Sequence, residues 1–528
     1  MFWGLIMENT LYYGDNLEIL RRHIKNEIID LIYLDPPFNS KANYNMIYTE
    51  PSGNKSDSQA QAFSDFWHWD EQAQRTYEYL TDSSNNIPAS IIELIQAYHN
   101  FLGTARNPKG DVDAYIVMMT IRLLELYRVL RPTGSIYLHC DPTASHYLKL
   151  VLDSIFGENN FRNEIIWHKR GGIHNVEKYF PRHHDTIFFY TKSEKYTFNP
   201  LKGDPTESST YPRWIKYSRD GGKTVLYKDF PKTDKVKFGR LLTTFRNEYG
   251  RDPRPDDVFF EFEGSSIDSV WSDLPDIYRG QAEKLGYPTQ KPLALLERIV
   301  SASSNKGDLV LDPFCGCGTA IDASEKLDRR WIGIDITHLA ISVIKRRLMD
   351  RYRNVEFEVI GEPKDIAGVR QLIEDDNTRY QFQWWAVGKV GGMPINNKKG
   401  KDQGRDGIIS FNSLIGAIKV IISVKSGGTG SKDIRDLKGT MEREKAKFGL
   451  LLTFEEPSKD MKSEAIQAGY EPISAIHRSI PRIEILTIED LLKGKQPEIY
   501  LIPRTETTFK QAKPEKPKPI QKGHNKKL

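Results

Sequence analysis

Short apolar runs and longer segments with helically spaced apolar residues alternate along the first part of the chain. In order they read NTLYYG, NLEILRRHIK, IDLIYL, YIVMMTIRLLELYRVL, GSIYLHC and SHYLKLVLDSIF. The alternation resumes later with PLALLERIVSAS, GDLVLD, AIDASEKL, RWIGIDI and HLAISVIKRRLMDRY. Strands that alternate with helices are typical of a parallel sheet covered by helices. The pattern therefore predicts an α/β fold.

Two stretches interrupt this alternation, and a third change of pattern predicts a domain boundary. Residues 50–110 form a polar, partly helical insertion, and residues 200–280 are rich in Gly, Pro, Tyr, Arg and Lys with irregular short strands. The pattern changes again after VEFEVIGEPKD. We expect one domain over 1–362, with 200–280 inserted into it, and a second over 365–502.

The net charge of +4 over 528 residues is unevenly distributed. The last 26 residues, 503–528, carry eight Lys or Arg and two Glu, hence +6, so the remaining chain carries 4 − 6 = −2. A Pro- and Lys-rich segment with few apolar residues is expected to be a disordered basic tail, either solubilising or phosphate-binding. Any surface for nucleic acid must therefore be local.

The three cysteines exclude a disulfide framework and a four-cysteine zinc site, which fits a reducing cytoplasm. The apolar start MFWGLIM is too short for a signal peptide or a membrane span, so no membrane partner is expected.

The stretch IDLIYLDPPF combines a buried strand with a sharp break. The apolar run ends in Asp35, and Pro36, Pro37 and Phe38 follow. Two prolines exclude further strand and delay any helix. The segment thus places an acid, two rigid backbone units and an aromatic ring at the mouth of a sheet. A plain double-proline turn, with Asp35 as a helix cap, is the structural alternative.

The segment GDLVLDPFCGCGTAIDASEKLDRRWIGIDI, residues 307–336, predicts a nucleotide-type cofactor site on a doubly wound sheet. One strand ends in Asp312, a loop with Gly316 and Gly318 leads into a helix, and the next strand ends in Asp335. Glycines allow close approach of a ligand at a helix N-terminus, and an acid about 20 residues further on suits ribose hydroxyls.

Eight ordered pieces make the chain resemble the amino-group DNA methyltransferases of the β arrangement, in which the catalytic half precedes the cofactor half. They are YYGDNLEIL, LDPPF, GSIYLHCD, NEIIWHKR, HDTIFFYTKS, YPTQKP, DPFCGCGT and GIDI. The resemblance implies a Rossmann-like, S-adenosylmethionine-dependent enzyme that acts on double-stranded DNA in the cytoplasm and is encoded by a bacterium, an archaeon or a phage. It also implies a restriction–modification or phage-defence context, as a homodimer or with other restriction–modification subunits.

The resemblance assigns catalysis to Asp35, Pro36, Pro37 and Phe38. The exocyclic amine of a base is a poor nucleophile because its lone pair is delocalised into the ring. Acceptors beside its two N–H bonds, here Asp35 and the Pro36 carbonyl, localise that lone pair, and rigid prolines hold the carbonyl in place. Phe38 offers a face for a flipped-out base. Neither a metal nor a covalent enzyme intermediate is needed.

The resemblance also implies the cofactor-binding residues. Asp335 is expected to hold the ribose hydroxyls, Asp312 to lie near the amino group, and Thr289 and Lys291 near the carboxylate. Asp15 is expected to bind the adenine amine, although a helix N-cap suits it as well. The full set is Asp15, Thr289, Lys291, Asp312, Phe314, Gly316, Gly318, Thr319 and Asp335.

The substrate is less closely defined than the chemistry. Asp in the first position of the catalytic motif resembles N6-adenine enzymes more than N4-cytosine enzymes, which leaves N4-cytosine as the alternative. Residues 200–280 interleave basic and aromatic residues, which suits a target-recognition region. An RNA or protein methyltransferase with the same chemistry is a third reading, which this insertion argues against.

In the last domain, two strand runs at 407–411 and 417–425 flank a short turn near 415. A hairpin with that centre places Asp406 directly opposite Lys425, with Ser423 on the same face. An acid facing a lysine is the core of a divalent-metal phosphodiesterase site.

The region resembles the Mrr-like branch of the PD-(D/E)xK restriction nucleases, an α/β fold. Ser423 stands where those enzymes carry a carboxylate or glutamine, so Asp406 is the one expected ligand for Mg²⁺, with Glu374 or Glu442 as candidate replacements. An active nuclease and a non-cutting domain that docks DNA or a partner both remain open.

Overall fold

The computed structural model describes the chain from residue 9 to residue 506, with gaps. The described residues are 9–37, 43–49, 55–64, 69–102, 111–169, 178, 180–204, 215–218, 224–233, 235–261, 264–277, 283, 287, 289–352, 354–375, 380–395, 405–413 and 416–506. Phe38 and almost all of the basic tail lie outside them. Among the described residues, none of the helices combines the length and the apolar character that crossing a membrane requires.

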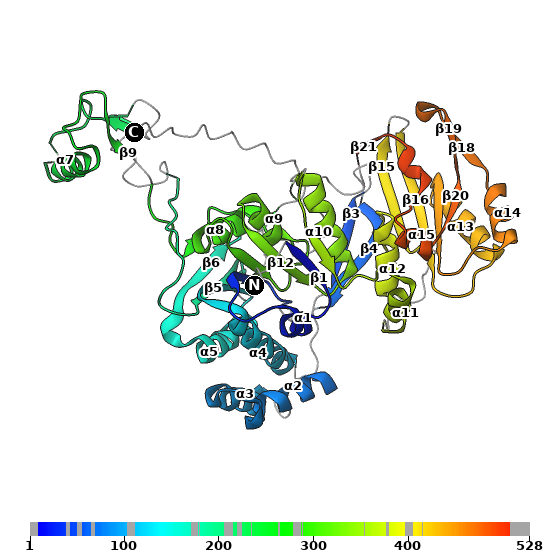
Figure 1. Cartoon of the computed structure of the whole chain (residues 1–528), viewed down its shortest axis with the longest axis horizontal. Coiled ribbons are helices and arrows are strands. Elements are labelled where there is room, and N and C mark those ends of the chain that lie inside the picture. Colours follow the sequence, from blue (N-terminus) through cyan, green and yellow to red (C-terminus); the bar gives the residue numbers. More distant parts are fainter. Residues whose placement is uncertain are drawn as a thin grey trace, which may run out of the picture.

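The larger body is built on a nine-stranded sheet with the strand order β10-β6-β7-β5-β2-β11-β12-β1-β13 (Figure 1). Its strands are β1 (Thr10–Tyr13), β2 (Ile29–Leu34), β5 (Leu130–Cys140), β6 (Phe161–His168), β7 (His184–Thr191), β10 (Val270–Trp271), β11 (Leu309–Asp312), β12 (Arg330–Asp335) and β13 (Glu358–Ile360).

The sheet is mixed, whereas the sequence pattern predicts a parallel one. Strand β7 runs antiparallel to both β5 and β6. Helix α5 (Ser145–Phe156) carries the chain from β5 to β6, two positions along the sheet. Strand β7 then returns directly into the position between them, and a strand that returns without a crossover to the far edge runs antiparallel.

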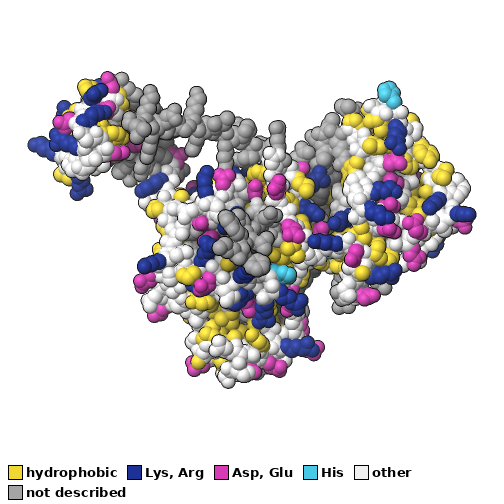
Figure 2. All heavy atoms as spheres, in the orientation of Figure 1, with side chains coloured by type: hydrophobic (Ala, Val, Ile, Leu, Met, Phe, Trp, Pro, Cys, Tyr) yellow, Lys and Arg dark blue, Asp and Glu magenta, His cyan; other side chains and the backbone are white. Residues whose placement is uncertain are grey.

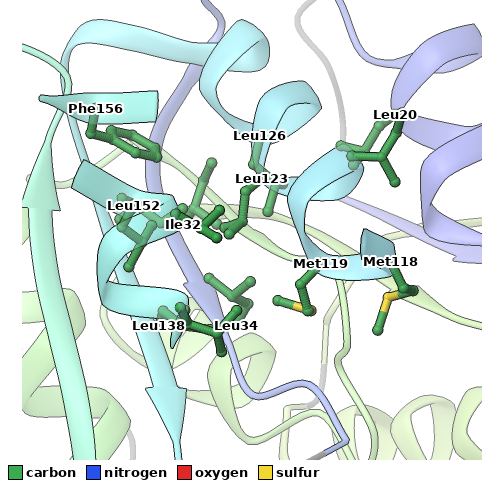
Figure 3. Packing of buried hydrophobic residues seen from close by; sticks show 14 of the residues in the cluster. Leu20, Ile32, Leu34, Met118, Met119, Leu123, Leu126, Leu138, Leu152 and Phe156 are labelled. Carbon is green, nitrogen blue, oxygen red and sulfur yellow. The ribbon is translucent and has the colours of Figure 1, made fainter. Parts of the chain in front are cut away.

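Helices cover both faces of this sheet, as a doubly wound fold requires. On one face α1 (Asn16–His23), α4 (Asp111–Val129) and α5 pack on the apolar side chains of β2 and β5. Figure 3 shows this packing, with Leu123 and Leu126 of α4 lying over Ile32 of β2. On the other face lie α8 (Leu293–Ser303), α9 (Thr319–Lys326) and α10 (His338–Arg351).

The two interruptions in the pattern correspond to additions to the sheet. The first holds the antiparallel hairpin of β3 (Asn43–Thr49) and β4 (Lys55–Ser64), then α2 (Glu71–Thr81) and α3 (Ala89–Leu102). The second holds β8 (Thr224–Leu226), α7 (Lys235–Tyr249) and β9 (Val258–Glu261). These three elements share a small core of their own, which contains Phe230, Phe245 and Phe259, and they lie away from the main sheet (Figure 1).

The second body is a smaller α/β domain on a sheet of order β14-β15-β16-β17-β20, with β21 paired to β15. Its elements are α11 (Ile366–Asp375), α12 (Tyr380–Lys389), β14 (Met393–Pro394), β15 (Gly407–Ser413), β16 (Gly416–Lys425), α13 (Ser431–Arg443), β17 (Phe448–Thr453), α14 (Lys459–Gln467), β18 (Tyr470–Ile473), β19 (Arg478–Pro481), β20 (Ile483–Thr487), α15 (Ile488–Leu492) and β21 (Arg504–Glu506). After β16 the order is helix, strand, helix.

Candidate active site

A cavity of about 530 Å³ opens at the carboxyl ends of β1, β2, β11 and β12. From β2 the chain continues toward β5, whereas from β11 it continues toward β12, so the sheet reverses its winding between β2 and β11. Ligands of doubly wound sheets bind at such a reversal, because the loops leave the two strands in opposite directions. The cavity lies where the fold itself predicts a ligand.

Most of the residues that the sequence singles out line this one cavity. They are Asp15, Asp35, Pro36, Pro37, Thr289, Lys291, Asp312, Phe314, Gly316, Thr319 and Asp335. Segments up to 320 residues apart in the chain thus come together, because most of them lie at or just after the ends of strands that meet at the same edge of the sheet. Thr289 and Lys291 come instead from the segment before α8.

Asp35 is held on one side and open on the other. Its Oδ2 accepts from the ammonium group of Lys291. Its Oδ1 is buried and has no hydrogen-bond partner among the described residues. Burial alone would lower the pKa of Lys291, but the carboxylates of Asp35 and Asp185 outweigh it and raise that pKa, so the lysine stays charged. The ion pair therefore orients Asp35 with an unpartnered acceptor.

A buried polar chain supports the end of β2 from behind. The Tyr33 hydroxyl lies 3.0 Å from Nδ1 of His139, and Nε2 of His139 lies 3.0 Å from Asp185. Lys169 donates to the other oxygen of Asp185 at 2.6 Å. These contacts fix the backbone just before Asp35, since Tyr33 lies two residues upstream in the strand.

The glycine loop is tied to Asp335 by its backbone. The N–H of Gly316 donates to Oδ2 of Asp335 at 2.9 Å, and Thr337 donates to Oδ1 through its N–H and its hydroxyl. Burial raises the pKa of Asp335 to about 6 against these hydrogen bonds, and burial raises the pKa of Asp312 well above its usual range. A cationic ligand beside these two carboxyls would favour their ionised forms and so oppose the effect of burial.

Two glycines of this loop differ in what they allow. Gly316 has φ +49° and lines the cavity. Gly318 has φ +75°, does not line the cavity, and a Cβ there would lie 2.8 Å from Cγ1 of Ile344. Gly318 therefore allows α10 to pack closely on the loop. The ligand contact of Gly318 that the motif implies stays a prediction.

Asp15 is a helix N-cap, the structural reading that the sequence left open. Its Oδ1 accepts from the N–H of Leu17 at 2.8 Å, and its Oδ2 pairs with Arg122 at 2.7 Å. The side chain still lines the cavity, so capping does not prevent it from meeting a ligand.

Sequence reasoning missed several residues that line the cavity. Arg122 comes from α4 and Tyr287 from the residue before PTQKP, where proximity to the motif was the available signal. Tyr380, Gln381 and Trp384 come from α12, which lies in the second domain, and no sequence signal linked them to this site.

The hairpin of the second domain has a different register from the expected one. Gly407 pairs with Ile422, so Asp406 falls opposite Ser423 and not opposite Lys425. Its carboxylate accepts from the N–H of Val424 at 2.7 Å and lies 3.4 Å from the Ser423 hydroxyl. Lys425 pairs instead with Asp433 at 3.7 Å. The pairing is centred one residue earlier than the sequence suggested, and this shift moves the partner of Asp406 by two residues.

The described residues around Asp406 do not fit a divalent metal. Within the part of the chain that the structure describes, no three His, Cys, Asp or Glu side chains gather as metal ligands. Glu374 and Glu442, the candidate replacements, are exposed on α11 and α13. Mg²⁺ prefers several oxygen ligands including carboxylates, and Asp406 already accepts from the backbone.

A comparison with protein families identifies the family of the domain that forms this cavity. The family model described as DNA methylase, N6_N4_Mtase, matches residues 29–346, which contain both the Asp35 motif and the glycine loop. This chain belongs to the N6/N4 DNA methylases. The methylase is accordingly an S-adenosylmethionine-dependent DNA methyltransferase of the type found in restriction–modification systems.

Curated relatives agree over the same region. The methylase is 27% identical over 370 residues to "Type II methyltransferase M.EcaI" of Enterobacter cloacae, covering 65% of this chain and 70% of the relative. It is 30% identical over 250 residues to "Type II methyltransferase M.HpaI" of Haemophilus parainfluenzae, covering 46% and 64%. It is 28% identical over 270 residues to "DNA adenine methyltransferase YhdJ" of Escherichia coli K12, covering 50% and 78%.

The second domain of the methylase matches a different family model. That model is described as "NACHT-associated inactive Restriction Endonuclease 1" and matches residues 380–480. The match confirms the prediction of a restriction-endonuclease-like domain, and its description is of an inactive one. We call residues 365–502 the endonuclease-like domain below.

Proposed function

We propose that the methylase transfers a methyl group to the N6 amine of an adenine flipped out of double-stranded DNA. The observation that carries this proposal is Oδ1 of Asp35, a buried acceptor without a partner among the described residues. A buried acceptor without a donor is costly, so its position indicates where a donor binds. The exocyclic amine of a base supplies such a donor.

The residues around Asp35 define how the amine would be activated. Oδ1 of Asp35 accepts from one N–H, and the carbonyl of Pro36, held by the rigid turn before Pro37, is proposed to accept from the other. These contacts localise the nitrogen lone pair, and Lys291 keeps the carboxylate turned toward the base. S-Adenosylmethionine, when bound, supplies an electrophilic methyl group on its sulfonium. As the amine nitrogen bonds to that methyl carbon, the carbon–sulfur bond would break and leave the sulfur as a neutral thioether, while the nitrogen would lose one proton, for which Asp35 is the proposed acceptor.

The cavity suits that cofactor in charge and shape. Gly316 lines it without a side chain, and the carboxyls of Asp312 and Asp335 lie buried beside it. The cofactor carries positive charge on both its sulfonium and its ammonium group, and an adjacent cation favours the ionised form of a buried carboxyl. We propose that Asp335 binds the ribose hydroxyls, Asp312 the ammonium group, and Thr319 and Phe314 the methionine part.

The choice of adenine over cytosine rests on the motif and on one relative. The first catalytic residue is Asp35, as in N6-adenine enzymes, and a relative named as a DNA adenine methyltransferase covers half of this chain. Methylated DNA digested to nucleosides and analysed by mass spectrometry should contain N6-methyladenine. N4-methylcytosine instead would refute the choice of base but not amine methylation. Transfer to RNA or protein alone would refute DNA as the substrate.

We propose that residues 200–280 recognise the DNA sequence. The unit of β8, α7 and β9 has its own core and carries Lys235, Lys237, Arg240 and Arg246 on α7. Lys and Arg side chains gather on its surface (Figure 2). Phosphates attract such side chains, and a unit folded apart from the sheet can reach along a groove.

We propose that the endonuclease-like domain does not cut DNA. The usual second carboxylate is absent at Ser423, and Asp406 and Lys425 bind other partners. Purified wild type is therefore expected to leave methylated and unmethylated DNA intact with magnesium or manganese, and Ser423→Glu should gain no nicking.

Cleavage that disappears in both Asp406→Ala and Lys425→Ala, with methylation unchanged, would restore the nuclease reading. Asp460→Ala, which alters an exposed acid in the first turn of α14, is the matched control.

A further inference from the structure

Helix α12 packs against two bodies through two different faces. Its first face lies in the core of the endonuclease-like domain and consists of Phe382, Trp385, Ala386 and Val387. Its second face belongs to a separate cluster, in which Tyr380 and Trp384 pack with Tyr287 and with Leu339 and Val343 of α10. A helix that is apolar on both faces is buried on both.

The contact between α12 and α10 is close and has specific partners. Tyr380, Trp384 and Gly388 are spaced by four residues and so share one side of α12. A Cβ on Gly388 would lie 2.5 Å from Oγ of Ser342 on α10. Glu362 pairs with Lys345 of α10 at 3.3 Å and with Lys389 of α12 at 3.0 Å. Close backbone approach and a shared ion pair indicate a defined docked position.

This docked face reaches the cofactor cavity. Tyr380, Gln381 and Trp384 line the cavity, and the rings of Tyr380 and Trp384 stack 6.0 Å apart. The N–H of His338, three residues after Asp335, donates to the side-chain oxygen of Gln381 at 3.4 Å. The cavity wall near the proposed ribose site therefore comes from the endonuclease-like domain.

We propose that the endonuclease-like domain completes the cofactor site through α12, so that cofactor binding and docking of this domain stabilise each other. The proposal rests on S-adenosylmethionine as the cofactor. A ligand that touches both bodies binds the docked arrangement more tightly than an undocked one. By linkage, the ligand must then strengthen docking by the same factor. The endonuclease-like domain thereby responds to whether cofactor is bound.

Calorimetry with S-adenosylmethionine on full-length variants tests the first half. Trp384→Ala removes an aromatic wall and should weaken cofactor binding by on the order of tenfold. Gly388→Leu does not alter a cavity residue but pushes α12 away from Ser342, so it should weaken binding too. Gly439→Leu, on α13 with no atom within 4 Å of the new Cβ, is the matched control.

Amide hydrogen exchange on the wild type tests the second half. S-Adenosylmethionine should slow exchange over residues 380–389 but not over 431–443 of α13, which does not line the cavity. If the wild type binds cofactor while Trp384→Ala and Gly388→Leu bind equally well, or if α12 gains no protection, the coupling is refuted and the proposed function stands. A wild type that does not bind S-adenosylmethionine would refute both. If Trp384→Ala does not fold, Gly388→Leu and the exchange measurement decide.

Discussion

Replacing Asp35 with alanine is expected to lower the turnover of methyl transfer by on the order of 100-fold or more. The substitution removes the carboxylate whose Oδ1 is the proposed acceptor for the amine, and it takes the Asp35 carboxylate away from the buried, cationic Lys291. Asp35 is proposed to contact the amine of the base, and this amine becomes activated only during the reaction. The loss should therefore appear in turnover, measured with a labelled methyl group on DNA, and not in cofactor affinity.

Asp30→Ala is the matched control for this experiment. Asp30 lies on the same strand at the end away from the cavity, where it pairs with Arg131 at 2.6 Å. The turnover of the Asp30→Ala variant should stay within about twofold of wild type. Full activity in Asp35→Ala would refute the assignment of Asp35 as the catalytic acceptor.

Cofactor binding is expected to be lost when the glycine loop or the acid beneath it is changed. Gly316→Val places a branched side chain on a backbone with φ +49°. The new Cβ would lie 3.4 Å from the ring of Tyr287, at a residue that lines the cavity. Asp335→Ala removes the proposed ribose acceptor and also releases the N–H of Gly316. Calorimetry with S-adenosylmethionine should show an affinity decrease of on the order of 100-fold in each variant.

Gly307→Val is the control that separates the effect of a side chain in the cavity from the effect of backbone strain. Gly307 also has positive φ, +82°, and nothing lies within 4 Å of its added Cβ. A valine at Gly307 is therefore strained in its backbone as at Gly316, but Gly307 does not line the cavity. It should be less stable to heat yet bind cofactor as wild type does. If Gly316→Val and Asp335→Ala both kept wild-type affinity, the cofactor would have to bind elsewhere.

Local patterns along the chain were sufficient to predict the cavity in outline. Each motif consists of an apolar strand followed by a chemically specific residue, such as Asp35 after β2 and Asp335 at the end of β12. The carboxyl ends of parallel strands meet at one edge of a sheet, so strand-end residues converge even when they are distant in sequence. Strand pattern, motifs and the family resemblance together therefore predicted eleven of the residues that line the cavity without any knowledge of contacts.

The tertiary structure alone decided which of these residues touch. Lys291, which the resemblance placed near the cofactor carboxylate, lines the cavity and pairs with Asp35, 256 residues away. Asp406 lies opposite Ser423 because the pairing of the hairpin is centred earlier than predicted. A shift of two residues leaves the alternation of apolar and polar residues unchanged, so this alternation could not distinguish the two registers. Gly318 serves the packing of α10, although its motif resembles a ligand loop.

The contribution of α12 to the cavity could not be read from the sequence at all. The segment YQFQWWAVGK specifies a buried helix, which any apolar core would satisfy. Its second buried face becomes a cavity wall because Gly388 lets α12 approach α10 closely, and α10 begins three residues after Asp335. Strand ends and glycine loops are encoded locally. The pairing of two surfaces depends on the shape and charge of both, and these exist only after each domain has folded.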